Sequence, residues 1–251
     1  TVQMVNHLEF EKGIIRMSTG ELSPDLMQTG IAKQVLANLS VGDRDLFMNY
    51  PDPLGLPILR EALRRQLQKI GIDVPISCIL IVSGALQALQ LISTGIVQPA
   101  SKVYVETPSY LSSLNIFQSV GARLCSMPMD EDGLLPWMSR ETQNNPNHAL
   151  LYTIPTFQNP TGIVMPRPRR KKLLQYCNEM HLPIIEDDVF RDLWLDAPPP
   201  PPIKSLDEYG NVVYISSLSK CFAPGLRLGW LVGPEAVVQR LADVKMQIDY
   251  G

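Results

Sequence analysis

One lysine, Lys220, stands between two apolar runs and is the residue that most constrains what this chain can be. Residues 212–215 form the first run, and residues 228–233 form the second, with glycines at 229 and 233. A lysine at the end of a buried strand loses its proton at little cost, and its neutral amine then condenses with an aldehyde to give a Schiff base. The sequence therefore indicates a covalent attachment site at Lys220.

Two hydroxyls and a guanidinium lie close to this lysine in the sequence. Ser217, Ser219 and Arg227 carry the groups that commonly hold a phosphate. An aldehyde and a phosphate on one small molecule suggest pyridoxal 5′-phosphate (PLP). The stretch is therefore interpreted as the lysine segment of a PLP site.

Residues 217–220 read S-L-S-K and residues 224–230 read P-G-L-R-L-G-W, and this pair of motifs resembles the lysine segment of fold-type I, aminotransferase class I/II proteins. Other motifs of that family match in order from about Gly20 to the last residue. The likeness is greatest to the aminotransferase-like domains of MocR-type (GntR family) regulators. It implies an α/β fold, with a three-layer α-β-α large domain, a mixed, mostly parallel sheet, and PLP at the carboxyl ends of the strands.

Length and composition fit one such domain. The 251 residues are 45% hydrophobic, and 22 Lys+Arg against 25 Asp+Glu give a formal net charge of -3. This charge does not favour nucleic-acid binding by this segment, so DNA contact would come only through a domain absent from the chain. The four cysteines are scattered without C-x-x-C spacing and the three histidines stand alone, which indicates neither disulfides nor a metal site and favours a reduced, cytoplasmic setting. The lack of a long apolar segment and of an export leader argues against membrane contact.

The order of the motifs predicts how the chain is divided. Residues 1–45 are expected to form an N-terminal segment that includes a helix over residues 25–39, and residues 46–251 are expected to form the PLP-binding large domain. The small C-terminal domain of the family is lacking, and the chain is interpreted as a fragment of a longer protein.

A strand, a glycine turn and a helix follow one another around Gly84. The β-branched run at residues 78–82 predicts the strand, and a helical spacing of apolar residues begins after the turn. The first N–H groups of such a helix point at one place, where the helix dipole favours an anion. We therefore predict a phosphate cup at Gly84, Ala85 and Leu86. Relatives commonly carry Ser or Thr after the glycine, so this cup has only backbone donors.

Two further strands lead to residues that match cofactor contacts of the family. Residues 102–106 predict a strand, followed by a helix capped by a threonine or serine, and Tyr110 matches the aromatic ring that stacks on the pyridine. From the residues alone, packing at a helix start explains Tyr110 equally well. Residues 149–154 predict another strand, and Asn159 of the N-P-T-G tetrad matches the asparagine that donates to the 3′-oxygen of the cofactor. Without the resemblance, the tetrad is a common turn.

An apolar strand over residues 182–185 ends in three acids at 186–188. Burying these carboxylates is costly unless a cation lies opposite, and a protonated pyridine nitrogen is such a cation. Asp187 matches the family position that keeps the ring protonated, a contact worth about 4 kcal/mol at an effective dielectric of about 20. Val189 and Phe190 stand where relatives usually place a tyrosine.

Three other segments have interpretations of their own. Residues 50–60 resemble the family's Y-x-D-x-x-G-x-x-x-L-R pattern, whose tyrosine reaches the phosphate of a neighbouring subunit, so Tyr50 implies a homodimer. On residue statistics alone a core tyrosine beside a turn is favoured. The basic run at 167–172 is interpreted as a solvated helix face, and the prolines at 198–202 as a rigid surface connection.

Three functions are compatible with these features. The first is amino-group transfer between an amino acid and a 2-oxo acid through a Lys220 Schiff base, with Asp187 as the second catalytic residue. The second is the PLP-dependent effector-sensing domain of a MocR-type regulator, which detects an amine. The third is an acyl-enzyme hydrolase, because residues 217–220 also spell S-x-x-K, but its partner motifs S-D-N and K-T-G do not occur. The first two remain open.

Overall fold

The computed structural model describes residues 48–138 and 149–249 and the single positions 11, 13, 20, 23, 30, 34, 37 and 38. The predicted N-terminal segment, residues 1–45, and the helix expected within it fall mostly outside the described residues. Residues 139–148 lie wholly outside the described residues. The division of the chain into a segment and a large domain therefore stays a prediction.

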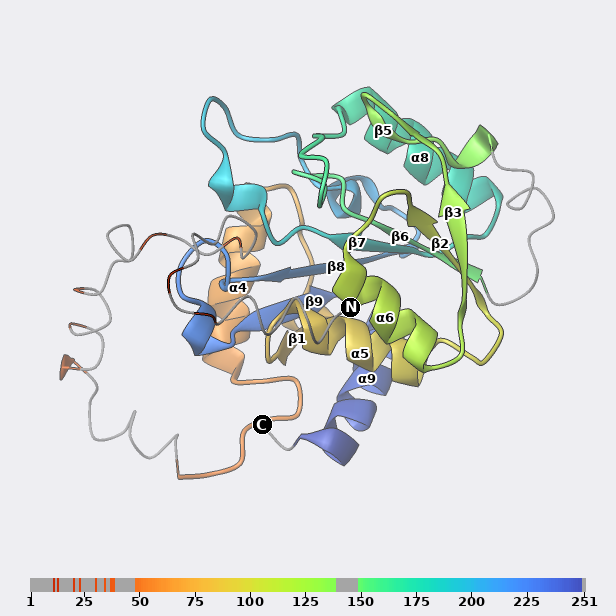
Figure 1. Cartoon of the computed structure of the whole chain (residues 1–251). Coiled ribbons are helices and arrows are strands. Elements are labelled where there is room, and N and C mark those ends of the chain that lie inside the picture. The colour runs from red at the N-terminus through yellow and green to blue at the C-terminus, as the bar shows by residue number, and fades with distance from the viewer. Residues whose placement is uncertain are drawn as a thin grey trace.

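Seven strands form the central sheet, in the order β1-β9-β8-β7-β6-β2-β3 (Figure 1). Only β9 runs antiparallel to its neighbours in this sheet, and the other six strands share one direction. This topology confirms the mixed, mostly parallel sheet expected from the resemblance. The strands are β1 Ile79–Val82, β2 Lys102–Glu106, β3 Arg123–Met127, β6 Ala149–Thr153, β7 Ile184–Asp187, β8 Val212–Ser217 and β9 Gly229–Val232.

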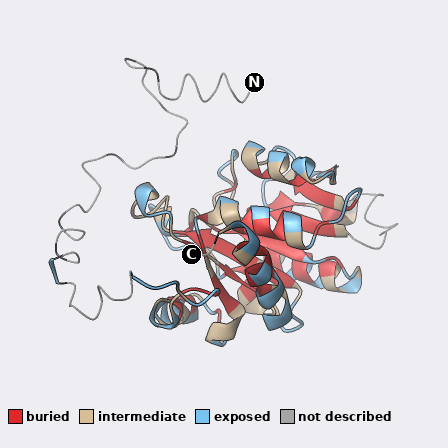
Figure 2. Cartoon of the chain, turned by 90° about the horizontal axis from the view of Figure 1, so that it is seen from below, coloured by how far each residue is buried: buried red, intermediate tan, exposed pale blue. Residues whose placement is uncertain are grey.

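Helices cover both faces of the sheet. One face packs against α4 (Pro57–Lys69) and α8 (Arg167–Glu179), and the other against α5 (Ala85–Gly95), α6 (Leu111–Ser119) and α9 (Glu235–Ile248). Figure 2 shows the strands mostly buried (red) and the helices with exposed residues (pale blue) on either side of them. The three-layer α-β-α architecture is therefore confirmed. Shorter elements are the hairpin strands β4 Met129–Asp130 and β5 Gly133–Leu134 and the 3-10 helices η2 Ile76–Cys78, η3 Pro136–Met138, η4 Arg191–Leu193, η5 Ile203–Leu206 and η6 Pro224–Leu226.

Alternation along the strands decides which layer each side chain meets. On β8, Val212 and Tyr214 join the clusters under α8 and α4, whereas Ile215 joins the cluster under α5, α6 and α9. By the same alternation, Asp187 and Ser217 belong to the α5 and α6 side of the sheet.

The parallel strands all end at one edge of the sheet. β9 begins at that edge, because Gly229 lies opposite both Val82 of β1 and Ser217 of β8. Loops at the carboxyl ends of parallel strands form the usual ligand site of such sheets. The segments after β1, β2, β6, β7 and β8, and the segment before β9, are the ones in which the sequence predicts cofactor contacts.

Two local predictions were wrong. The N-cap of α6 is Tyr110, without a side-chain cap, because the helix begins after the threonine and serine that were expected to cap it. The basic run at the start of α8 is only partly solvated. The guanidinium of Arg170 is fully buried, because the helical period places Arg170 on the same face as Leu173 and Leu174.

Within the part of the chain that the structure describes, no helix combines the length and the apolar character needed to cross a bilayer.

Candidate functional site

Asp187 is buried at the end of β7 and receives one hydrogen bond from a side chain. Oη of Tyr152, on the neighbouring strand β6, donates to Oδ2 of Asp187 over 2.8 Å. Oδ1 has no hydrogen-bond partner among the described residues. Burial raises the pKa of Asp187 to about 7, and the nearby charge of Asp188 adds to the rise, whereas hydrogen bonding by Tyr152 and by the Val189 amide opposes it. The Asp187 carboxylate can therefore accept a further hydrogen bond, at Oδ1.

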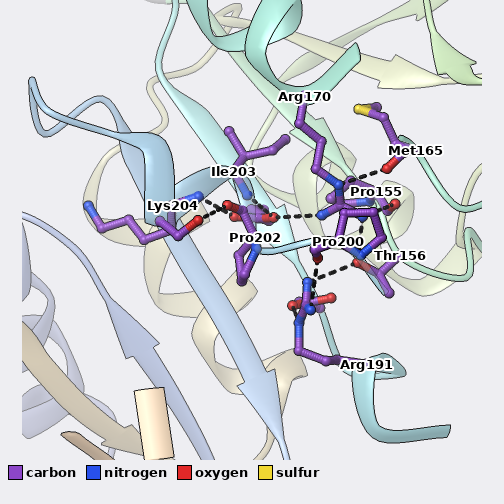
Figure 3. Close-up of polar contacts among 12 residues, drawn as sticks. Pro155, Thr156, Met165, Arg170, Arg191, Pro200, Pro202, Ile203 and Lys204 are labelled. Carbon is purple, nitrogen blue, oxygen red and sulfur yellow. Dashed lines mark hydrogen bonds and ion pairs between the residues drawn. The ribbon is translucent and has the colours of Figure 1, made fainter. Parts of the chain in front are cut away.

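The two neighbouring acids have cations of their own, Arg170 and Arg191, which are labelled in Figure 3. Oε1 of Glu186 lies 3.6 Å from Nη1 of Arg170, and Asp188 pairs with Nε of Arg191. Glu186 also accepts the amides of Ile203 and Lys204 over 2.7 and 2.8 Å. Three acids in one strand end were expected to need a bound cation, but the protein itself supplies a partner for two of them. Only Asp187 lacks one among the described side chains.

The same network fixes the proline-rich connection to the sheet. Nη1 of Arg191 donates to the carbonyl of Pro200 over 3.0 Å, three residues before the first of the two amides that bind Glu186 (Figure 3). Burial raises the pKa of Glu186, and Arg170 opposes this rise. The prolines therefore serve as a surface connection whose end is anchored by buried charges, as the sequence predicted in outline.

The phosphate cup predicted at the start of α5 has the expected backbone. Gly84 is the N-cap of α5 and has a φ of 82°, which favours glycine. The amides of Ala85 and Leu86 have no acceptor among the described residues. The amide of Ser83 is taken by Oε1 of Gln87 over 2.6 Å. Two unpaired N–H groups and a helix dipole thus remain for an anion.

Arg227 covers this cup from the segment before β9. Its Nη2 donates to the carbonyl of Ser83 over 3.1 Å, and its Nη1 donates to Oγ of Ser219 over 3.2 Å. A Cβ on Gly84 would lie 2.4 Å from Nη2 of Arg227, and a Cβ on Gly229 would lie 2.7 Å from two backbone atoms of Gly84. Both glycines are therefore required for the close approach of β9 to the cup.

Lys220 lies in the turn that follows β8, beside these groups. Ser217 is buried, and its Oγ accepts the amide of Ser219 over 3.3 Å. A Cβ on Gly20 would lie 3.5 Å from Nζ of Lys220, so Gly20, where the family motifs begin to match, lies next to the lysine. The structure thus brings Lys220, Ser219 and Arg227 together with the cup at Gly84.

Tyr110 and Asn159 lie on neighbouring loops, after β2 and β6. Tyr110 is half-buried and packs against the core cluster under α5 and α6. Asn159 is half-buried, and its side-chain amide has no hydrogen bond to any described residue. A buried hydrogen bond joins the ends of the two loops, in which Nε2 of Gln158 donates to Oε2 of Glu106 over 3.1 Å.

Tyr50 is not a core residue. It is 84% exposed, which excludes the interpretation as a core tyrosine beside a turn. The rest of its motif stabilises the loop: Nη2 of Arg60 pairs with Oδ2 of Asp52 over 3.1 Å, and Nε donates to the carbonyl of Gly55 over 2.9 Å. The role of Tyr50 across a dimer stays a prediction.

The sequence did not reveal Tyr152, Gln87, Glu106 or Gln158. A signal for Tyr152 was available, because alternation in two adjacent parallel strands places it on the same face as Asp187. Gln87 lies one helical turn after Ser83, at the spacing from which a side chain can reach back to a free amide.

The described residues fit a PLP molecule. The cup and Arg227 suit a phosphate, the bare Oδ1 of Asp187 suits a protonated ring nitrogen, and Lys220 supplies an amine. A Cβ on Gly229 would lie 3.1 Å from the nitrogen of Ala85, so the absence of a side chain there leaves room at this backbone donor. Fold and site together define a domain of the aminotransferase type.

The chain belongs to the aminotransferase class I and II family, whose model matches residues 12–248. Among solved structures it is similar to a kynurenine aminotransferase of Pyrococcus horikoshii, with 31% identity and a TM-score of 0.90, over 99% of this chain and 63% of that one. It is also similar to LysN, an α-aminoadipate aminotransferase of Thermus thermophilus, with 30% identity and a TM-score of 0.88, over 98% of this chain and 62% of that one.

Curated relatives of high similarity have names of another kind. The HTH-type transcriptional regulators YdfD and YisV of Bacillus subtilis are 50% and 47% identical to the chain over its whole length, and NorG of Staphylococcus aureus is 37% identical. The chain covers 52%, 51% and 56% of these three proteins. It therefore spans about half the length of the curated relatives that it matches.

Proposed function

We propose that this aminotransferase-type domain binds PLP, with Lys220 as the covalent anchor and Asp187 as the partner of the ring nitrogen, and that it transfers amino groups between amino acids and 2-oxo acids. The observation that carries the proposal is the buried carboxylate of Asp187, which has an unpartnered Oδ1 and no cation among the described residues, whereas Glu186 pairs with Arg170 and Asp188 with Arg191. The similar Pyrococcus horikoshii enzyme, whose crystal structure is a complex with PMP, supports the cofactor.

The phosphate would be held at the start of α5. The amides of Ala85 and Leu86 donate from the cup, and Arg227, Ser217 and Ser219 add a cation and two hydroxyls. Because two hydrogen bonds fix the Arg227 guanidinium over Gly84, little side-chain entropy is lost when an anion binds.

The ring would be oriented by residues from three loops. Asp187, when ionised, stabilises a proton on the ring nitrogen, Tyr110 stacks on a ring face, and Asn159 donates its amide to the 3′-oxygen. When bound, PLP supplies an electron sink for negative charge at the substrate carbon that bears the amino group. Lys220 Nζ is the group that moves the proton at that carbon, and Gly20 leaves room beside it.

The proposal includes a dimer in a cytoplasmic setting. The exposed ring of Tyr50 is held at the end of a loop that Asp52 and Arg60 make rigid, as expected of a residue that contacts a second copy. In such a dimer Tyr50 would reach the phosphate bound by the partner.

A second function, effector sensing, is favoured by the curated relatives. YdfD, YisV and NorG are named as HTH-type transcriptional regulators, and the chain matches about half of each. The same PLP site would then detect an amino acid or amine and change the placement of an attached DNA-binding domain. Val189 and Phe190, in place of the family tyrosine, suit a site that need not turn over rapidly.

Borohydride reduction after incubation with PLP tests the cofactor assignment. The expected result is one phosphopyridoxyl group per chain, found by peptide mass on the peptide that contains Lys220 and missing from Lys220→Ala. Labelling at other lysines alone, or equal labelling of the variant, would disprove the anchor. A lysine away from the cup, Lys69, provides the matched control as Lys69→Ala.

Amino acids then distinguish the two functions in the protein that contains this domain. Release of 2-oxo acid over many turnovers supports the transferase. A change in DNA affinity with one amine and without turnover supports the sensor. Loss of both responses in Lys220→Ala assigns either effect to this site.

A further inference from the structure

The loops of Tyr110 and Asn159 follow two neighbouring parallel strands. Val105 of β2 is aligned with Tyr152 of β6, so both loops leave the sheet at the same edge. No hydrogen bond between the side chains of Tyr110 and Asn159 is present among the described residues. A different contact joins the two loops, the hydrogen bond between Gln158 and Glu106.

Glu106 ends β2 and is buried without a cation among the described residues. It accepts hydrogen bonds from Oγ1 of Thr153, from the amide of Ile154 over 3.2 Å, and from Nε2 of Gln158 over 3.1 Å. Burial raises the pKa of Glu106, and these donors oppose the rise. All three donors belong to β6 and the loop after it, so this carboxylate joins the end of β2 to the next strand.

Gln158 continues the connection in the other direction. Its Nε2 also donates to the carbonyl of Pro108 over 2.8 Å, and its Oε1 accepts the amide and the hydroxyl of Thr161 over 2.9 and 2.6 Å. The orientation of the amide is determined, because a carbonyl oxygen only accepts and a backbone N–H only donates. Every donor and acceptor position of this side chain is in use, and it is 2% exposed.

We propose that Glu106 and Gln158 are positioning residues of the cofactor site, which hold the loop of Tyr110 and the turn of Asn159 in one arrangement before PLP binds. Pro108 stands two residues before Tyr110, and Gln158 stands directly before Asn159. A shift of the Gln158 side chain therefore moves both groups that orient the ring. The contact itself is independent of the proposed function, whereas its effect on PLP rests on it.

Gln158→Glu tests the inference with a side chain of the same size. The variant places two carboxylates in contact and leaves the carbonyl of Pro108 without its donor. Without PLP, hydrogen exchange is expected to become faster both at residues 109–112 and at residues 158–163. The dissociation constant for PLP is expected to rise about tenfold or more, the effect of losing a hydrogen bond to a charged group.

In the combined variant Glu106→Gln, Gln158→Glu, the amide at position 106 can donate to the carboxylate at position 158. The hydrogen bond between the two positions is thus restored with donor and acceptor exchanged. It is expected to recover part of the PLP affinity that Gln158→Glu loses. Leu174→Ala is the control for general destabilisation, because Leu174 packs in the cluster under α8, on the opposite face of the sheet from the proposed ring site. It should lower the melting temperature and leave the PLP dissociation constant unchanged.

Three results would overturn the inference. One is faster exchange at residues 158–163 with wild-type exchange at residues 109–112, another is wild-type affinity for PLP in Gln158→Glu, and the third is a combined variant no better than the single one. If the wild-type protein does not bind PLP, the proposed function fails. Exchange in the protein without cofactor still decides whether the two loops are coupled.

Discussion

Tyr152 donates a hydrogen bond of 2.8 Å to Oδ2 of Asp187 and leaves Oδ1 of the same carboxylate without a partner among the described residues. The two oxygens of the buried Asp187 carboxylate therefore have different roles. One oxygen is fixed by a neighbouring strand, and the other is kept for a ligand. Because Tyr152 is fully buried as well, the direction of Oδ1 is set before any ligand arrives.

Tyr152→Phe should destabilise the protein more at alkaline than at acidic pH. Loss of a hydrogen bond to a buried ionised group costs about 1–3 kcal/mol. Tyr152 holds the pKa of Asp187 down, so the loss is largest above pH 7, where the carboxylate is charged. Urea unfolding at pH 8 and pH 5 measures the difference, with the exposed Tyr209→Phe as control. Equal losses at both pH values would contradict the assignment.

Asp187→Asn should change how stability depends on pH in the protein without cofactor. The pKa of Asp187 rises from 3.8 to about 7 on folding, so the folded state binds more protons than the unfolded state. Its contribution to stability is therefore present below about pH 4 and is lost as the pH rises to about 7, with a slope of at most about 1.4 kcal/mol per pH unit. The amide of the variant cannot titrate, so this part of the slope should disappear.

Glu186 provides the internal comparison for that experiment. Burial also raises the pKa of Glu186, and Asp187→Asn leaves this group in place. The difference between the wild type and the variant therefore isolates Asp187. A difference that does not vary between pH 4 and pH 8 would show that Asp187 has an ordinary pKa.

Gly229→Ala should loosen the phosphate cup. The new Cβ would lie 2.7 Å from the Cα and carbonyl carbon of Gly84, and backbone atoms cannot move aside as a flexible side chain can. We expect lower stability and at least tenfold weaker binding of PLP, measured by titration. Gly225→Ala, in the same segment, meets no atom within 4 Å and should bind PLP as the wild type does. Similar PLP affinity in Gly229→Ala and Gly225→Ala would contradict the conclusion that the close contact between Gly229 and Gly84 shapes the cup.

Arg191→Met should be among the most destabilising substitutions outside the cofactor site. It leaves the fully buried Asp188 without its cation, and breaking a buried pair on one side costs about 3–5 kcal/mol. Adding Asp188→Asn removes the stranded charge and should recover part of this loss. Denaturant unfolding of the single and double variants measures the recovery. No recovery would mean that Arg191 acts mainly through its bond to Pro200.

The sequence predicted which residues gather at one edge of the sheet better than it predicted their hydrogen-bond partners. Asp187 ends a recognisable strand, and Asn159 and Lys220 follow such strands, so their common edge could be predicted. Tyr152 and Asp187 are 35 residues apart, and Glu106 and Gln158 are 52 apart. These contacts depend on the register between strands, which the local pattern does not contain.

The burial of charged side chains also could not be predicted from the local sequence. The run at the start of α8 was interpreted by its composition, but the helical period buries Arg170 and leaves Lys171 and Lys172 exposed. The two acids at the end of β7 point to opposite faces of the sheet, so Glu186 and Asp187 meet different partners. The number of charged residues in a segment does not show which of them are buried. That depends on the direction in which each side chain points from its helix or strand.

The position of β9 affects how the protein can fold. β1 pairs only with β9 in the described sheet, although about 150 residues separate them in the chain. During synthesis β1 therefore has no strand beside it until almost the whole domain has left the ribosome. Gly84 and Arg227 meet in this same step, so the anion cup closes as one of the last long-range contacts. An intermediate without β9 would expose the edge of β8 and would be prone to association with other chains.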